Sequence, residues 1–260
     1  MQQEVIELQL WQIAAAYLFI LILMAIVRSR GIPREKEIVI ATVRMTLQLI
    51  LTGYILVYLF ENIHPLLTVL AVIVMLVFAV FNIMKRVRME LPFKLKKIIA
   101  FSMCAGTTTS LLYFILVVIH LSPWYEPRYF IPIAGMIIGN SMTGISLGVT
   151  RLVEGMRSQR HMVEAALMLG STPKVAAKPI ADMAFDSAII PTINSMVGMG
   201  IVFLPGLMTG QILSGVSPIT AIEYQIAIML GIVGSVALTV ILFVELGYQA
   251  FFNIDQQLEN

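Results

Sequence analysis

The sequence predicts an all-α integral membrane protein with about seven transmembrane helices, because it is too apolar for a soluble domain and its apolar residues come in long runs. Hydrophobic residues make up 59% of the 260 residues and charged residues 12%. A soluble domain carries roughly 45–50% apolar and about 25% charged residues. A helix needs roughly 20 apolar residues to cross a bilayer. No polar stretch is long enough for a soluble domain, so we expect one transmembrane domain over residues 1–260.

The seven expected spans cover residues 9–27, 38–60, 66–84, 98–119, 130–149, 187–212 and 219–244. The sixth is interrupted by "LPGLMTG" at 204–210, where a Pro-Gly pair removes a hydrogen-bond donor and loosens the backbone. Irregular backbone at membrane depth is tolerated only against protein or a cavity. We therefore expect this break to be shielded from lipid.

The positive charges orient the chain. Of the 17 Lys and Arg residues, 15 lie in the loops that follow the first, third and fifth spans. Cytoplasmic loops carry such an excess of Lys and Arg, so the N-terminus is predicted to lie outside and the C-terminus in the cytoplasm. The first residues, "MQQEVIELQL", lack the positive region of a secretory signal. The first apolar run is therefore expected to remain as a helix.

The cytoplasmic connection over about 150–187 is the longest polar stretch and is typical of a helical hairpin. Ser158 is a candidate N-cap for a first helix, and Gly170 suits the residue just after its end. Thr172 and Pro173 suit the N-cap and first position of a second helix. One face of that helix is charged, since four residues follow at intervals of four: Lys174, Lys178, Asp182 and Asp186. The hairpin suits either the lipid headgroup region or a groove on another protein.

The stretch "EAALMLG", residues 164–170, resembles the EAA-x3-G loop of ABC transporter permeases. The match extends to Ile180 at the importer spacing, but "ADM" then stands where that pattern has x-Leu-Pro. In ABC permeases this coupling helix docks into a cleft on a separate ATPase subunit. The resemblance implies that the following residues face such a partner: Glu164, Ala165, Ala166 and Gly170. Alanines permit close approach, and the carboxylate suits a basic partner residue.

Four further segments resemble FetB-type permeases: "IPIAGMIIGNSM" (131–142), "LGSTP" (169–173), "IIPTINSM" (189–196) and "LPGLMTGQILSGVSPITAIEYQI" (204–226). The resemblance covers most of the chain. It implies the permease subunit of an ATP-driven transporter in the inner (plasma) membrane, exporting iron or another metal ion. It also implies a homodimer of the permease with two ABC ATPase subunits. Plant relatives are linked to aluminium tolerance, so the substrate stays open.

The chain contains no GxxxxGK[ST] sequence. Without that phosphate-binding loop it is not expected to bind ATP by this means. We therefore expect no cofactor on this chain, with ATP and Mg on the partner ATPase, and no enzyme activity in the permease itself. We expect the chain to contact the lipid bilayer and not to bind nucleic acid.

Polar side chains within or at the ends of the expected spans are the candidate pathway residues: Arg44, Gln48, Asn140, Asn194, Gln211 and Glu223. Ionisable groups inside a membrane usually face the bundle interior, and oxygen atoms suit a hard cation. Asn140 suits interhelical hydrogen bonding equally well. No His, Cys or carboxylate set has metal-ligand spacing, so the metal ligands remain unknown.

Small and sulfur-containing residues leave two readings each. Span five contains four glycines that form a ridge for close helix approach within or between subunits: Gly135, Gly139, Gly144 and Gly148. Met196, Met199 and Met208 flank the break in span six. Thioethers favour soft ions such as Cu(I), but they also fill irregular gaps in apolar cores.

Two alternative functions remain open. One is an ABC permease for a different solute, either another metal or a small organic molecule. The other is a secondary transporter coupled to protons or sodium, which usually needs carboxylates in mid-membrane. All 15 Asp and Glu residues fall in loops, tails or span ends, which disfavours the second alternative.

Overall fold

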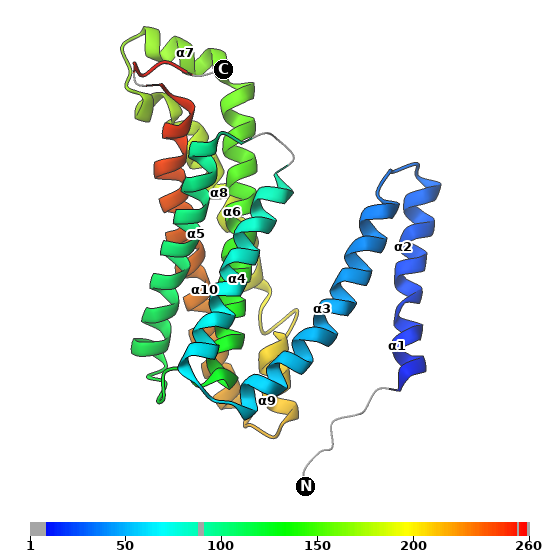
Figure 1. Cartoon of the computed structure of the whole chain (residues 1–260). Helices are drawn as coiled ribbons and strands as arrows, with labels where there is room; N and C mark the ends of the chain where they lie inside the picture. The colour runs from blue at the N-terminus through cyan, green and yellow to red at the C-terminus, as the bar shows by residue number, and fades with distance from the viewer. Residues whose placement is uncertain (1–8, 88–90, 254, 259–260) are drawn as a thin grey trace. The chain divides into compact units, whose positions relative to one another are not determined.

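The computed structural model describes residues 9–87, 91–253 and 255–258, and nearly all of these are helical or in short connections (Figure 1). The chain divides into two compact units. The first comprises Met1–Asn62 with Leu213–Gly215, and the second comprises Ile63–Ile212 with Val216–Asn260. Each unit is described by itself, and one permease domain over 1–260 stays a prediction.

The first unit is a helical hairpin. Helices α1 (Leu10–Ala16) and α2 (Leu18–Ser29) follow one another almost directly, and α3 (Glu35–Glu61) returns beside α2. The hydroxyls of Tyr17 and Thr46 lie 2.5 Å apart and join the two arms. Within these three helices only Val27 and Leu59 are buried. The hairpin therefore leaves nearly all its apolar surface for lipid or for another protein.

The second unit is a bundle of five long helices with shorter elements at their ends. The long helices are α4 (Pro65–Arg86), α5 (Phe93–Tyr113), α6 (Pro127–Ser158), α8 (Pro173–Gly198) and α10 (Pro218–Gly247). A π-helical turn, Phe114–Val118, extends α5, and a 3-10 turn, Tyr248–Phe251, extends α10. The short helices are α7 (Arg160–Met168) and α9 (Gly206–Leu213).

Helix α6 is the centre of the bundle, because α4, α5, α8 and α10 all pack against it. Its Ile137, Ile145 and Leu152 side chains are fully buried. The hydroxyls of Ser141 on α6 and Ser235 on α10 lie 3.0 Å apart in the core, which pairs two buried polar groups. Such pairing satisfies polar atoms that would otherwise be costly to bury.

The glycine ridge of α6 is used only in part. A Cβ atom added at Gly144 would lie 2.9 Å from Val236 Cγ1, and one added at Gly148 would lie 3.5 Å from Ala188 Cβ. At Gly135 the nearest atom is Met75 Cε at 3.9 Å, and at Gly139 nothing lies within 4 Å. Two glycines thus serve packing within the chain, and two leave α6 open to approach from outside.

Among the described residues, six helical segments are long and apolar enough to cross a membrane: Leu10–Ser29, Glu35–Glu61, Pro65–Arg86, Phe93–Val118, Pro127–Ser158 and Pro218–Phe251. They coincide with the expected spans one to five and seven. The prediction of an all-α protein with several membrane-spanning helices is confirmed. The count of seven and the orientation of the termini stay predictions.

The expected sixth span, residues 187–212, is not one helix. Helix α8 begins already at Pro173 and contains Pro179 and Pro191. The second helix of the expected hairpin and the inner half of span six are therefore one continuous helix.

The irregular backbone lies at 199–205, so the predicted break at 204–210 was wrong in position. Gly200 adopts φ +85 within it, a conformation that favours glycine. Pro205 comes just before the first turn of α9, where a missing N–H breaks no helical hydrogen bond.

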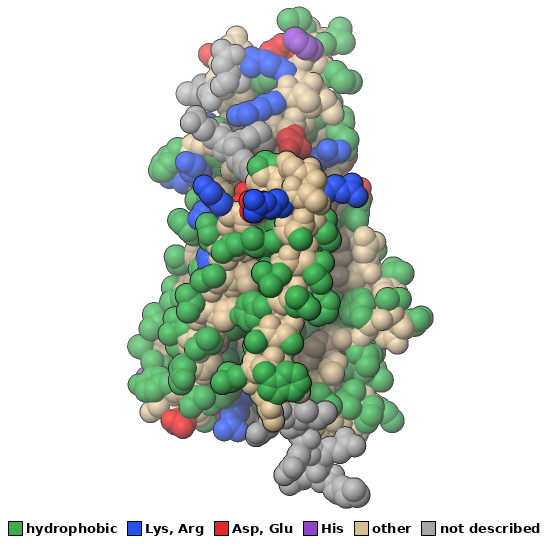
Figure 2. Space-filling model, turned by 90° about the vertical axis from the view of Figure 1, so that its right-hand side faces the viewer, with side chains coloured by type: hydrophobic (Ala, Val, Ile, Leu, Met, Phe, Trp, Pro, Cys, Tyr) green, Lys and Arg blue, Asp and Glu red, His purple; other side chains and the backbone are tan. Residues whose placement is uncertain are grey.

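Charged side chains gather around helix ends, while hydrophobic side chains cover the long helices (Figure 2). Within the second unit, α7 and the described C-terminal segment lie at the same end as the end of α4 and the start of α5 (Figure 1). Lys85, Arg86, Lys94 and Arg160 belong to this end. Arg128, in the first turn of α6, belongs to the opposite end. The charge separation expected from the sequence is therefore present within this unit.

Candidate functional site

The polar hairpin begins differently from the prediction. Helix α6 continues through Ser158, whose hydroxyl lies 3.5 Å from the Gly155 carbonyl, and α7 starts at Arg160 with Gln159 as N-cap. The prediction that Ser158 caps this helix was therefore wrong. The reason is local: residues up to Ser158 keep helical geometry, and the bend between α6 and α7 occurs at Gln159 without a side-chain cap.

The corner of the hairpin agrees with the prediction. Gly170 has φ +88, and its N–H donates to the Leu167 carbonyl at 2.9 Å. The N–H of Ser171 donates to the Ala166 carbonyl at 3.0 Å, which completes a Schellman pattern at the end of α7. Thr172 then accepts a hydrogen bond from the Val175 N–H at 3.5 Å, and Pro173 is the first residue of α8. These contacts fix a sharp turn between two helices.

Helix α7 presents a mixed surface. Glu164 is half-buried, and its carboxylate accepts a hydrogen bond from Arg160 Nε at 2.7 Å. Ala165 and Gly170 are exposed and Ala166 is half-buried. At the tip, the apolar side chains of two residues project outward: Met168 is 87% and Leu169 88% exposed. An exposed apolar tip beside an ion pair suits contact with another protein better than contact with water.

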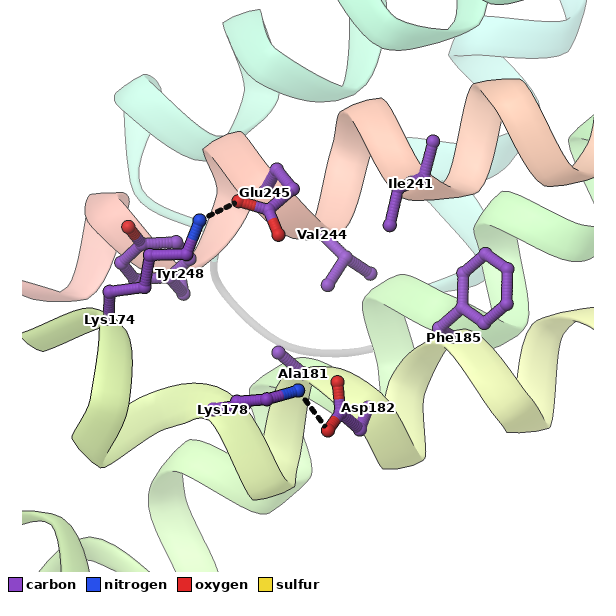
Figure 3. Close-up of a pocket in the computed structure, with 9 residues that line it drawn as sticks. All are labelled: Lys174, Lys178, Ala181, Asp182, Phe185, Ile241, Val244, Glu245 and Tyr248. Carbon is purple, nitrogen blue, oxygen red and sulfur yellow. Dashed lines mark hydrogen bonds and ion pairs between the residues drawn. The ribbon is translucent and has the colours of Figure 1, made fainter.

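Two ion pairs lie near the start of α8, and one of them joins α8 to another helix (Figure 3). Lys174 Nζ lies 2.8 Å from Glu245 Oε2 on α10, and Lys178 Nζ lies 2.7 Å from Asp182 Oδ2 on α8 itself. The hydrogen bond that Lys174 donates to Glu245, together with the negative charge of that carboxylate, raises the pKa of Lys174. These side chains line a cavity of about 290 Å³ whose floor includes Phe185. The corner is thus connected to the last turns of α10.

A second cavity, of about 650 Å³, lies between α6 and α8 at the same end of the bundle. It is lined by the side chains or backbone of Arg151, Glu154, Gly155, Arg157, Ser158, Gln159 and Met183. All except Met183 belong to the end of α6 or to the bend that follows it, and Met183 belongs to α8. The cavity therefore shows that Arg151 of α6 and Met183 of α8 lie on the same open side of the α6–α8 pair.

From the cavity toward the middle of both helices, the same open side carries both polar and apolar residues. Counting back from Arg151 by helical spacing gives Leu147, Thr143 and Asn140 on α6, and counting forward from Met183 gives Ser187, Ile190 and Asn194 on α8. Thr143 and Ser187 are half-buried, and the other four are exposed. We call these six residues the α6–α8 face.

The two candidate amides of this face lie at nearly the same level. Gly144 packs against the Ala188 carbonyl in the antiparallel α6–α8 pair. Asn140 precedes Gly144 by four residues on α6, and Thr192 follows Ala188 by four residues on α8, so these two residues lie at the same level. Asn194 follows Thr192 by two residues, or about 3 Å along the helix axis. The structure therefore brings Asn140 and Asn194 to one face, which their sequence separation did not indicate.

Asn140 does not link helices within the described part of the chain. Its Nδ2 donates to the Met136 carbonyl of its own helix at 2.8 Å. Asn194 has no hydrogen-bond partner among the described residues. Both amides thus keep free hydrogen-bonding capacity on an exposed surface of the chain.

The other candidates belong to other helices. Arg44 is half-buried and Gln48 exposed on α3 of the first unit. Gln211 is half-buried in α9, and Glu223 is exposed near the start of α10. The roles of all the candidate residues stay predictions. Within the described residues, no group of three His, Cys, Asp or Glu side chains is placed to hold a metal ion.

Gln225 is a polar residue that the sequence reasoning did not single out. It lies in α10, is only 6% exposed, and its Oε1 atom has no hydrogen-bond partner in the part of the chain that the structure describes. Its Nε2 lies 3.7 Å from Met199 Sδ, beside the irregular backbone at 199–205. The sequence did contain a signal for this residue, because Gln225 is an amide two turns inside a largely apolar helix.

Comparison with known proteins gives the family. Residues 10–252 match the model of an uncharacterised protein family, UPF0014. The UPF0014 membrane protein YjkA of Bacillus subtilis is 36% identical over 242 residues, which cover 93% of this chain and 95% of the relative. No solved structure matches the chain.

Two further relatives carry functional names. The probable iron export permease protein FetB of Escherichia coli is 32% identical over 246 residues, covering 95% of this chain and 93% of the relative. The protein ALUMINUM SENSITIVE 3 of Arabidopsis thaliana is 33% identical over 246 residues, covering 95% and 88%. With the model match over nearly the whole chain and several helices that can span a membrane, this protein is a multi-pass membrane protein of the UPF0014 family.

Proposed function

We propose that this chain is the membrane-spanning subunit of an ATP-driven ABC transporter, and that the α7–α8 hairpin is its coupling element. The observation that carries the proposal is the hairpin itself. Its corner is fixed by Gly170, its apolar tip is exposed, and Lys174 ties it to α10 through Glu245. A rigid element of this kind can pass a push from a docked partner to the helices behind it.

The energy source would be a separate ATPase subunit. The chain has no phosphate-binding loop of the GxxxxGK[ST] type, so ATP and Mg would bind to the partner. Two permease copies would work with two ATPases in the inner (plasma) membrane. Closing of the ATPases around ATP would move the hairpin and change which side of the membrane the helices open to. The N-terminus would lie outside and the C-terminus in the cytoplasm, with α8 and α9 together as the interrupted sixth of seven spans.

Iron, or another metal ion, exported from the cell is the substrate we propose. The support is the name of the relative FetB, a probable iron export permease protein. Amide and hydroxyl oxygens on the α6–α8 face are compatible with a metal cation that keeps part of its water. A different solute carried by the same ATP-driven mechanism is the second candidate, since the name ALUMINUM SENSITIVE 3 does not point to iron.

Inside-out vesicles that carry this chain and its ATPase test the proposal. We expect ATP-dependent accumulation of iron that disappears with an ATPase unable to hydrolyse ATP. Absence of accumulation for iron, while the ATPase still co-purifies, would retain the permease and remove iron as the substrate. Absence of any ATPase that co-purifies would reject the ATP-driven assignment.

The coupling element has its own test. Glu164→Ala and Gly170→Val should reduce ATP-driven transport while the variants still fold. Met162→Ala is the matched control, because this side chain lies on the same helix and is 70% exposed. Full transport by both Glu164→Ala and Gly170→Val would contradict the role of the hairpin.

A further inference from the structure

The α6–α8 face cannot be an ordinary lipid-facing surface. Asn140 uses one N–H on its own helix, which leaves its Oδ1 and second N–H open, and Asn194 has no partner among the described residues. Hydrocarbon offers no hydrogen bonds, so polar groups at membrane depth are costly unless protein or water covers them. Something polar therefore covers this face in the membrane.

The same side of α6 has room for another helix. Among the described residues, no atom lies within 4 Å of a Cβ added at Gly139, and a Cβ added at Gly135 meets only the end of Met75. Small residues of this kind allow helix backbones in a membrane to approach closely. Since Gly144 and Gly148 are already occupied inside the chain, the open pair marks the direction from which a further helix can arrive.

We infer that a second copy of this chain covers the α6–α8 face about a two-fold axis, with α6 beside α6, and that Asn140 and Asn194 of both copies surround a passage for a partly hydrated metal cation. In a two-fold interface the same patch meets itself. An amide suits such a contact because it carries both donors and an acceptor and can pair with its own copy.

The charges at the end of the face are self-complementary. Arg151 and Glu154 lie three residues apart on exposed positions of α6. When two copies of α6 run side by side in the same direction, Arg151 of one copy comes near Glu154 of the other. These residues also line the cavity of about 650 Å³, so the passage would open directly into a polar vestibule.

The chemistry of the passage follows from its neutral oxygen atoms. The membrane part of the face offers amide and hydroxyl groups from Asn140, Thr143, Ser187 and Asn194, and none of its six residues is a carboxylate or a thioether. Oxygen ligands suit hard cations, whereas soft ions such as Cu(I) prefer sulfur. A site without negative charge binds weakly and releases its ion readily. This cation passage rests on the proposed function, which already includes two permease copies. The placement of their interface on the α6–α8 face rests on the observations above and not on that function.

Disulfide crosslinking in native membranes tests the interface. The single native cysteine is removed by Cys104→Ser, and one cysteine is introduced at a time as Leu147→Cys or Asn140→Cys. Leu147 is 40% exposed, so its replacement should not disturb folding. Leu230→Cys is the matched control, since Leu230 is 60% exposed but lies on α10. We expect a covalent dimer for residues 140 and 147 but not for residue 230. If only monomers form at both test positions, the proposed interface is wrong. The same result is expected if another segment of the same chain, and not a second copy, covers the face.

Substitution of the amides tests the passage separately. We expect Asn140→Leu and Asn194→Leu to lower metal transport at least about tenfold, while Leu147→Cys in the same chain still forms the dimer. Asn140→Gln should retain most of the transport, because it keeps the amide. Dimer formation with undiminished transport by both Leu variants would overturn the passage. Dimer formation in vesicles that transport no metal, even with the native amides, would support the interface and count against the proposed function instead.

Discussion

Lys174 Nζ lies 2.8 Å from Glu245 Oε2, so a charged hydrogen bond joins the first turn of α8 to the end of α10 (Figure 3). The two residues are 71 positions apart in the chain. Lys174 follows the Gly170 corner by four residues, and α10 packs along α5, α6 and α8. This contact therefore connects the exposed hairpin to the centre of the bundle.

Reversal of charge at this contact should weaken coupling without unfolding the protein. We expect Lys174→Glu to repel Glu245 and to lower the amount of solute moved per ATP, and the double variant Lys174→Glu with Glu245→Lys to restore most of it. Thermal unfolding should change little, because exposed ion pairs contribute weakly to stability. Lys178→Glu is the control, since Lys178 pairs with Asp182 within α8. Equal losses in the single and double variants would argue against a connecting role.

The same contact makes a prediction about pH. The hydrogen bond and charge of Glu245 raise the pKa of Lys174 above its usual 10.5. A raised pKa in the folded state means that the contribution of the pair is complete below the usual lysine pKa and is lost only as the pH rises through the higher value. Coupling should therefore show no titration of this residue between about pH 6 and about pH 9. Lys174→His should introduce one near pH ~6.5, with coupling falling as the pH rises. A flat profile for that variant would contradict this.

Close packing against α10 predicts different effects for two glycines. A Cβ atom at Gly106 would lie 2.4 Å from Thr239 Oγ1 and 2.7 Å from its Cα, which is backbone and cannot move aside. Overpacking of this kind costs about 1–3 kcal/mol, so Gly106→Ala should lower the thermal unfolding temperature in detergent. Gly234→Ala is the control on α10, because nothing lies within 4 Å of its added Cβ. A stable Gly106→Ala variant would show that α5 and α10 can separate slightly.

The sequence predicted those features that depend on local chemistry. The apolar runs located six of the helices, and the hairpin corner agreed at Gly170, Thr172 and Pro173 because caps and turns depend on a few neighbouring residues. The predicted cap at Ser158 was wrong because Ser158 is still the last residue of α6, and Gln159 is the N-cap of α7. The shared face of Asn140 and Asn194, and the contact between Lys174 and Glu245, depend on how distant helices pack. No spacing within a single helix carries that information.

The Gly170 corner should tolerate asparagine better than valine. The φ of +88 costs a residue with a side chain roughly 1–2 kcal/mol, and asparagine accepts this region more readily than β-branched residues do. Nothing lies within 4 Å of an added Cβ at this position, so the cost is one of backbone conformation and not of space. We expect Gly170→Asn to keep the ATPase bound and Gly170→Val to lose it, measured by co-purification. Equal retention by the two variants would mean that the corner does not require this backbone conformation.

Replacement of Gln225 by an apolar residue should raise the stability of the protein and lower its transport activity. Its Oε1 is buried without a partner among the described residues, and an unpaired buried acceptor costs about 1–3 kcal/mol. Gln225→Leu keeps a similar volume and removes that acceptor, so the variant should unfold at a higher temperature in detergent. Gln249→Leu is the control, because Gln249 is exposed and its replacement should change the unfolding temperature little. A lower unfolding temperature for Gln225→Leu would mean that the amide is satisfied in the membrane, for example by water. If stability rises while transport falls, Gln225 contributes to transport. Its amide lies beside Met199 and the irregular backbone at 199–205, and a residue that lowers stability has no structural reason to be there.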